Sequence, residues 1–165
     1  MRKYTVYVDQ SGKIEDYSMN TGLAFSDEGG NNFTNAVFID KEHKRRLKHK
    51  AKNDLGDIKK YQYKLFACGV FMLIQNDVHR ISEVKIDKEY EGKIGLIKNY
   101  IYNFLINNSN VSKSSFPEIS SCLVHGVNEK PECHDLSYKA RERNLEHFLE
   151  SDFQFLKAMI LKSNR

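Results

Sequence analysis

The chain has 165 residues, 40% of them hydrophobic and 29% charged, and a formal net charge of +4 at pH 7. This length suits one domain with a real hydrophobic core, which we place over residues 1–165, and it is short for two domains. No apolar run approaches the roughly 18 residues of a membrane span, so we expect a cytoplasmic protein without a membrane partner.

Three strands are predicted first, at residues 3–9, 21–26 and 35–39. The first run is rich in Val, Tyr and Thr, which favour a pleated strand, and it ends at Asp9. Gln10, Ser11 and Gly12 form a turn, so we expect the Asp9 carboxylate at the end of a central strand, pointing toward solvent. The turn signals between the runs favour an antiparallel meander.

The remaining segments alternate between helical and strand patterns, at 54–75, 81–87, 91–107, 119–126 and from 132 onward. Asp54 is predicted to cap the first of these helices, which is apolar enough to be buried. The strand that follows ends in a second aspartate, Asp87. The last segment has apolar residues at three- to five-residue intervals and predicts one long helix, bent near Asn144.

Three strands followed by helix, strand, helix, strand and helix form the element order of the RNase H-like fold. That α/β fold is a mixed five-stranded sheet with flanking helices (β-β-β-α-β-α-β-α), and the chain resembles it over nearly its whole length. In RNase H-like proteins the first and fourth strands lie side by side. The resemblance therefore implies that Asp9 and Asp87 meet at one edge of a cleft.

Three short motifs add to this resemblance: Tyr7-Val8-Asp9-Gln10-Ser11-Gly12, Ile86-Asp87 and His134-Asp135-Leu136. They are similar to the D-E-S-G opening, the middle-strand aspartate and the A-D-L segment of a family of uncharacterised RNase H-like proteins from bacteria, archaea and phages. Gln10 stands where that family has an acid, and His134 stands where it has a small residue. The resemblance implies a nuclease-like site that includes Asp135.

Phosphodiester hydrolysis gives a chemical reason to gather carboxylates. Two Mg²⁺ or Mn²⁺ ions held roughly 3.5–4 Å apart can activate the attacking water and stabilise the leaving oxygen, and both ions prefer hard oxygen ligands. In the expected site Asp9 bridges the metals, while Asp87 and Asp135 each hold one. His134 or His125 would handle protons near neutral pH.

Each of these acidic residues also has a structural interpretation. Asp9 can be a turn former, and Asp135 can be a first-turn carboxylate that the helix dipole favours. Glu89 and Glu91 are interpreted as solvated, with metal ligation as the alternative. RNase H enzymes also take a carboxylate from the first helix, where this chain offers only Asp57.

Residues 41–52 form a basic stretch, with seven Lys and Arg side chains against Glu42 alone. The net charge of this stretch is +6, so the basic character of the chain is local. It can be an ordinary exposed helix start or loop. We expect instead that it binds the backbone of DNA or RNA without reading sequence, through Lys44, Arg45, Arg46 and Lys48.

The three cysteines are not predicted to carry chemistry. Cys68 and Cys122 are interpreted as small buried hydrophobic residues. Cys133 and His134 are adjacent, and neighbouring side chains on a helix point roughly 100° apart, which disfavours a nucleophile pair. The sequence thus predicts a Mg²⁺- or Mn²⁺-dependent nuclease. The alternative is a noncatalytic nucleic-acid or protein-binding module on the same fold.

Overall fold

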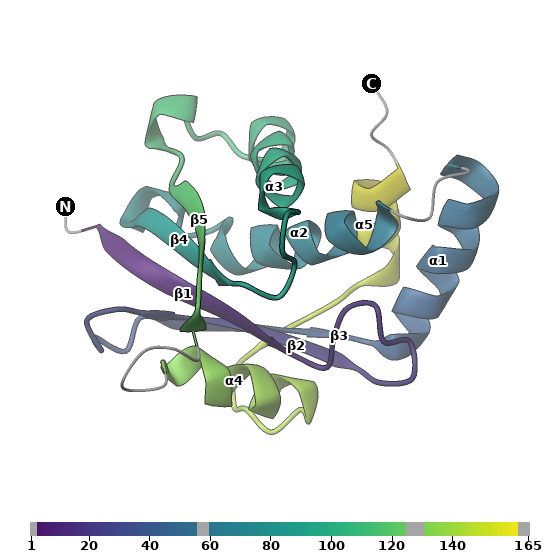
Figure 1. Ribbon diagram of the computed structural model, residues 1–165, viewed down its shortest axis with the longest axis horizontal. Coiled ribbons are helices and arrows are strands. Elements are labelled where there is room, and N and C mark those ends of the chain that lie inside the picture. Colours follow the sequence, from purple (N-terminus) through teal and green to yellow (C-terminus); the bar gives the residue numbers. More distant parts are fainter. Residues whose placement is uncertain (1–2, 56–59, 125–130, 162–165) are drawn as a thin grey trace.

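A six-stranded mixed sheet forms the centre of this α/β molecule (Figure 1), in the order β5-β4-β1-β2-β3-β6. The computed structural model describes residues 3–55, 60–124 and 131–161. The strands are β1 (Tyr4–Ser11), β2 (Thr21–Asp27), β3 (Thr34–Ile39), β4 (Ile81–Asp87), β5 (Glu118–Cys122) and β6 (Leu149–Glu150). The α-helices are α1 (Lys41–Leu55), α2 (Tyr61–Ile74), α3 (Ile94–Asn108), α4 (Glu132–Arg141) and α5 (Phe153–Leu161).

The first three strands form the predicted antiparallel meander, since β2 pairs with both β1 and β3 in antiparallel register. β4 returns along the free edge of β1 and pairs with it in parallel, and β5 then pairs in parallel with β4. The carboxyl ends of β1, β4 and β5 therefore meet at one edge of the sheet.

The helices cover the two faces of the sheet unequally (Figure 1). α2 packs on β2 and β3, with α1, α3 and α5 on the same side, whereas α4 covers the opposite face over β1, β2 and β3. Side chains alternate between the faces along a strand. On β2, Leu23 and Phe25 enter the large core under α2, while Ala24 enters a small cluster under α4.

Small residues let α4 lie close against the sheet. Gly22 of β2 faces α4 so closely that a Cβ atom placed on it would lie 1.9 Å from the backbone oxygen of Ser137. Ala24 and Ala36 continue this surface and pack against Cys133 and Ala140 of α4. Any larger side chain at position 22 would push α4 away from the sheet.

The predicted start of the helix at 54–75 is wrong. The basic stretch forms α1, and Asp54 belongs to the end of that helix rather than capping the next one. The N-cap position of α2 is Lys60, whose side chain makes no capping hydrogen bond. Burial of the nearly all-apolar α2 against the sheet offsets the missing cap, because tertiary packing outweighs local signals. Asp57 lies outside the described residues.

The expected single helix from residue 132 onward is also wrong, and the expected five strands become six. α4 ends at Arg141, and Arg143 takes a left-handed backbone conformation with φ of 54°. The chain then reaches the edge of β3, where β6 pairs in parallel and Ser151 donates its backbone N–H to Phe38 O at 2.8 Å. The apolar spacing continues through this break because α5, like α4, has one buried side.

The last predicted strand is shorter than expected. β5 ends at Cys122, four residues before the predicted end of this strand, and Val124 lies beyond it; His125 and Gly126 are outside the described residues. Within the described ranges, no helix is both long and apolar enough to cross a membrane.

Candidate functional site

Asp9 and Asp87 lie side by side on adjacent parallel strands. The β1–β4 ladder pairs Val8 with Ile86, so the next residue on each strand is at the same height. Side chains at equivalent positions of paired strands point to the same face. For Asp9 this is the α4 face, because its β2 partner Ala24 packs in the cluster under α4. The predicted adjacency of the two aspartates is confirmed.

The prediction that Asp9 points to solvent is wrong. β1 continues two residues past it to Ser11, and α4 packs over this part of the strand, leaving Asp9 only 2% exposed. Asp87 is the last residue of β4 and is 8% exposed. Burying a carboxylate without a partner is strongly unfavourable, so the contacts of these two side chains matter.

A third carboxylate, Glu89, joins them from the loop between β4 and α3. One oxygen atom from each of Asp9, Asp87 and Glu89 lies within 4.8 Å of the other two. The chain turns directly after β4, with the Glu89 backbone N–H donating to Asp87 O at 2.8 Å, and this turn returns Glu89 toward the strand end. We call these three residues the acidic group.

Hydrogen bonds orient the two buried aspartates. The Gln10 backbone N–H donates to Asp9 Oδ1 at 2.8 Å, and His134 Nδ1 lies 2.8 Å from Asp9 Oδ2. The Val124 backbone N–H donates to Asp87 Oδ1 at 3.0 Å. Because a carboxylate oxygen can accept two hydrogen bonds, these contacts fix the carboxylates without using all of their lone pairs.

The electrostatics of the acidic group favour a bound proton or cation. Burial raises the pKa of Asp9, the hydrogen bond from His134 opposes this rise, and the negative charge of Asp87 adds to it. The pKa of Glu89 is also raised, first by burial and further by Asp9 and Asp87, against the hydrogen bond from Gln10. A divalent cation would remove this repulsion, and three carboxylates form an oxygen-only ligand set that fits Mg²⁺ or Mn²⁺.

α4 brings His134 rather than Asp135 into contact with the acidic group. His134 binds Asp9, whereas Asp135 is exposed in the first turn of α4 and is not among the carboxylates that converge. Cys133 faces the sheet and donates its backbone N–H to Ser26 Oγ at 2.9 Å. Cys133 and His134 therefore face different surroundings, and burial raises the pKa of the Cys133 thiol to about 12.

The basic stretch contains a lysine that does not face solvent. Lys44 has 0% exposure, and its Nζ donates to Asp16 O at 2.6 Å, to Thr21 Oγ1 at 2.9 Å and to Lys13 O at 3.3 Å. Burial lowers its pKa to about 8. Lys44 thus anchors the loop between β1 and β2 and does not lie on a surface that phosphate could reach.

The outward face of α1 retains the other basic side chains. A shallow hollow on this face is lined by Arg45, Arg46, His49, Lys50 and Asn53. Arg45 pairs with Glu42 one turn earlier, and the Arg46 guanidinium lies 3.7 Å from the centre of the Phe153 ring. The predicted Lys48 is half-buried, with its ammonium 4.2 Å from the Tyr17 ring centre.

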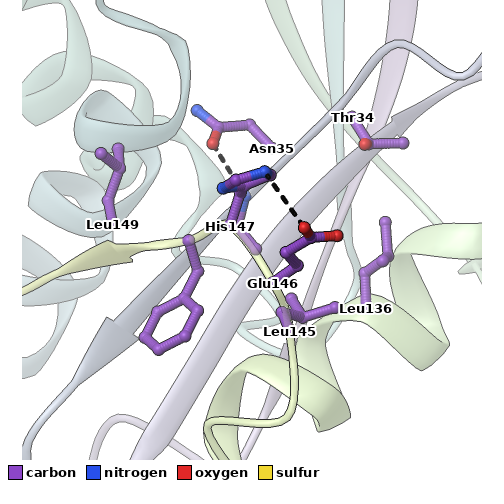
Figure 2. A pocket seen from close by; sticks show the side chains of 9 residues that line it. Thr34, Asn35, Leu136, Leu145, Glu146, His147 and Leu149 are labelled. Atoms are coloured by element: carbon purple, nitrogen blue, oxygen red, sulfur yellow. Dashed lines mark hydrogen bonds and ion pairs between the residues drawn. The ribbon is translucent and has the colours of Figure 1, made fainter.

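A larger hollow, of about 660 Å³, lies on the α4 face between α4, β3 and residues 145–149 (Figure 2). Leu136 and Leu145 line it, while Glu146 and His147 pair at its margin, 4.0 Å apart. Leu136 lies two residues after His134, roughly 200° around the helix. α4 therefore separates this hollow from the acidic group.

Neither a protein-family model, nor a curated protein sequence, nor a solved structure matches the chain.

Glu89 is the member of the acidic group that the sequence analysis interpreted as solvated, with metal ligation only as the alternative. The signal was its position two residues after Asp87, in Asp87-Lys88-Glu89 at the end of a strand. Only the turn after β4 shows that Glu89 faces back toward Asp9. A charged residue in a polar loop is otherwise more typical of a solvated surface.

Proposed function

We propose that this protein is an RNase H-like, divalent-metal-dependent nuclease whose metal site is the acidic group. The observation that carries the proposal is the convergence of Asp9, Asp87 and Glu89, of which the two aspartates are almost fully buried. The side-by-side placement of β1 and β4 supports it, since the RNase H-like fold has the same pairing. In this proposal Glu89 takes the place of the exposed Asp135 as the third ligand.

The residues of the site have separate roles in this proposal. Asp9, Asp87 and Glu89 would hold Mg²⁺ or Mn²⁺, which supplies charge stabilisation to a phosphodiester and lowers the pKa of bound water. His134 is the proposed proton carrier, because an imidazole ring can both donate and accept a proton. Its hydrogen bond to Asp9 holds the ring beside the acidic group.

The proposed substrate is DNA or RNA, bound through the outward face of α1. The hollow on this face is lined by two pairs with i,i+4 spacing, Arg45 with His49 and Arg46 with Lys50. Arginine and lysine side chains suit contacts to phosphates, and the described residues that line the hollow offer no Phe, Tyr or Trp ring on which a base could stack. Lys44 is excluded from this surface by its burial.

The test is cleavage of labelled single-stranded and duplex DNA, RNA and hybrid substrates in Mg²⁺, in Mn²⁺ and in chelator. We expect cleavage only with metal, and a loss of about 100-fold or more in Asp9→Asn, Asp87→Asn and Glu89→Gln. Glu91→Gln is the matched control, because this glutamate follows two residues later and is exposed. Cleavage that persists in chelator, or in Asp87→Asn, contradicts the proposal.

A noncatalytic nucleic-acid-binding module is the second candidate. The observation that favours it is the burial of Asp9, whose two oxygens already accept hydrogen bonds from Gln10 and His134. This candidate predicts metal-independent binding without cleavage. The same set of substrates distinguishes the two functions, since binding is measured in chelator and cleavage in Mn²⁺.

A further inference from the structure

Gln10 lies next to Asp9 and connects the end of β1 to the loop after β4, with 9% of its surface exposed. Its Nε2 donates to Glu89 Oε2 and, at 2.9 Å, to the Tyr90 hydroxyl. Its Oε1 accepts the backbone N–H of Ile14 at 3.3 Å. A primary amide has two N–H donors and one oxygen, so all three have a partner here.

These partners require an amide at position 10. Two of them, the Glu89 carboxylate and the Tyr90 oxygen, accept from Nε2, while the Ile14 N–H needs an acceptor. A glutamate would oppose the Glu89 carboxylate with a second negative charge. A flipped amide would place its oxygen against the same carboxylate. The residue that replaces the acid of the D-E-S-G motif is thus matched to its surroundings.

Tyr90 is itself firmly held, which makes it a fixed support for Gln10. Its hydroxyl donates to Glu15 Oε2 at 2.8 Å. Its ring packs edge-on against two aromatic rings of α2, with centre distances of 5.0 Å to Phe66 and 5.6 Å to Tyr63. Aromatic contacts of this geometry are favourable beyond the area they bury.

We propose that Gln10 is the positioning residue that holds Glu89 beside Asp9 and Asp87 as the third ligand of a divalent cation. This inference rests on the proposed metal site. Glu89 is the least buried of the three carboxylates, lies on a loop and is repelled by the other two. The hydrogen bond from Gln10 opposes that repulsion and keeps Glu89 directed inward when no cation is bound.

The test measures Mn²⁺ affinity by titration calorimetry, without nucleic acid, in wild type and in Gln10→Met. Methionine has a similar length and no hydrogen-bonding N–H. We expect Gln10→Met to bind Mn²⁺ about 10–100-fold more weakly, the usual effect of removing a residue that orients a metal ligand. Gln154→Met, at an exposed position of α5, is the matched control and should bind as wild type does. Melting curves in chelator establish that each variant is folded.

A double-mutant cycle with Glu89→Gln separates positioning from general damage to the fold. If Gln10 acts through Glu89, then Gln10→Met causes no further loss of Mn²⁺ affinity once Glu89 is replaced. A purely structural role of Gln10 would lower the affinity in both backgrounds alike. Gln10→Asn, which keeps the amide but shortens it, replaces Gln10→Met if that variant does not fold, and should show the same pattern.

The Mn²⁺ titrations distinguish failure of the metal site from failure of the positioning role of Gln10. Wild type that binds no Mn²⁺ at millimolar concentration overturns both the metal site and the role of Gln10. Wild-type affinity in Gln10→Met, together with a loss in Glu89→Gln, overturns the role of Gln10 alone and leaves the metal site standing. Additive losses in the cycle also overturn the positioning role.

Discussion

At the scale of single residues, burial decides how Asp9 behaves. A carboxylate at a strand end is ordinary in solvent, but here α4 covers it and Asp87 lies beside it. Both burial and the neighbouring charge favour the protonated form, and the hydrogen bond from His134 only partly offsets them. The metal-free site is therefore electrostatically unfavourable at neutral pH.

The raised pKa of Asp9 makes the stability of the folded chain depend on pH. Because the pKa of Asp9 is raised on folding, the folded chain keeps this proton to higher pH than the unfolded chain does. The contribution of Asp9 to stability is therefore lost as pH rises from about 4, the pKa of an unfolded aspartate, through the folded pKa. We expect Asp9→Asn in chelator at pH 7.5 to melt about 2–4 °C higher than wild type, the shift that 1 kcal/mol produces at this size.

Melting curves at several pH values check this expectation. The advantage of Asp9→Asn should shrink as the pH falls toward about 4 and vanish below the pKa of an unfolded aspartate, where wild-type Asp9 is protonated in both states. Asp135→Asn is the control, because Asp135 is exposed and lies outside the acidic group, so its replacement should not reproduce the rise in melting temperature. An Asp9→Asn variant that melts below wild type at pH 7.5 would show that the hydrogen bonds of the carboxylate outweigh its burial.

At the scale of elements, α1 has an inner side that is buried and includes the anchoring Lys44, and an outer side that carries exposed basic residues. Leu47 and Ala51 are buried on its inner side together with Lys44, while Arg45, His49 and Lys52 are exposed. The basic residues of one short stretch consequently have different roles. Only those on the outer side can meet a phosphate.

The exposed side of α1 is tested by Arg45→Gln combined with Lys50→Gln. We expect weaker binding to all nucleic-acid sequences alike. The slope of log affinity against log salt should fall in magnitude by about 0.9 per lost contact on duplex DNA, or about 1.8 for both. Fluorescence anisotropy in chelator at several salt concentrations measures it. Lys113→Gln with Lys139→Gln, exposed elsewhere, gives the same change in net charge and should leave the slope unchanged.

For Lys44→Met we expect the reverse of the α1 surface variants: a loss of stability without a change in nucleic-acid binding. The substitution takes the Nζ donor away from Asp16 O and Thr21 Oγ1, while Lys13 O still accepts the Asp16 backbone N–H at 2.9 Å. We therefore expect a loss of about 1–3 kcal/mol in unfolding free energy. The salt slope should remain that of wild type. A large change in slope with little change in stability would place Lys44 on the binding surface instead.

At the scale of the whole molecule, the acidic group exists only in the folded chain. Asp9 and Asp87 are far apart in sequence and meet through β1–β4 pairing, and α4 adds His134 from near the other end. A cation held by these residues binds the folded state and hardly the unfolded one. Metal binding should therefore stabilise the entire domain.

The expected stabilisation is about 2.7 kcal/mol when Mn²⁺ is present at 100 times its dissociation constant, or about 5–10 °C in melting temperature. Calorimetric melts in chelator and in millimolar Mn²⁺ measure this. The double variant Asp9→Asn with Asp87→Asn should melt at the same temperature in both buffers. Equal melting of wild type in both buffers would leave the noncatalytic module as the better proposal.

The sequence alone determined the elements whose pattern is local. Alternating residues and turn signals identified β1 to β4 and the meander, and helical spacing identified α3, because each depends on a few neighbouring residues. The same pattern placed Asp9 and Asp87 near strand ends. The resemblance in element order added that these strands would be adjacent, which the pairing of β1 with β4 confirms.

Tertiary structure decided what depends on distant contacts. Lys44 looks like its basic neighbours in sequence, and only the β1–β2 loop packed over α1 makes it a buried anchor. The apolar spacing of the last segment does not reveal β6, since both α4 and α5 continue it. Glu89 joins the acidic group because the chain turns after β4 and Gln10 holds it there. Local periodicity records which side of an element is buried, whereas the partners of a side chain are set by how the elements pack.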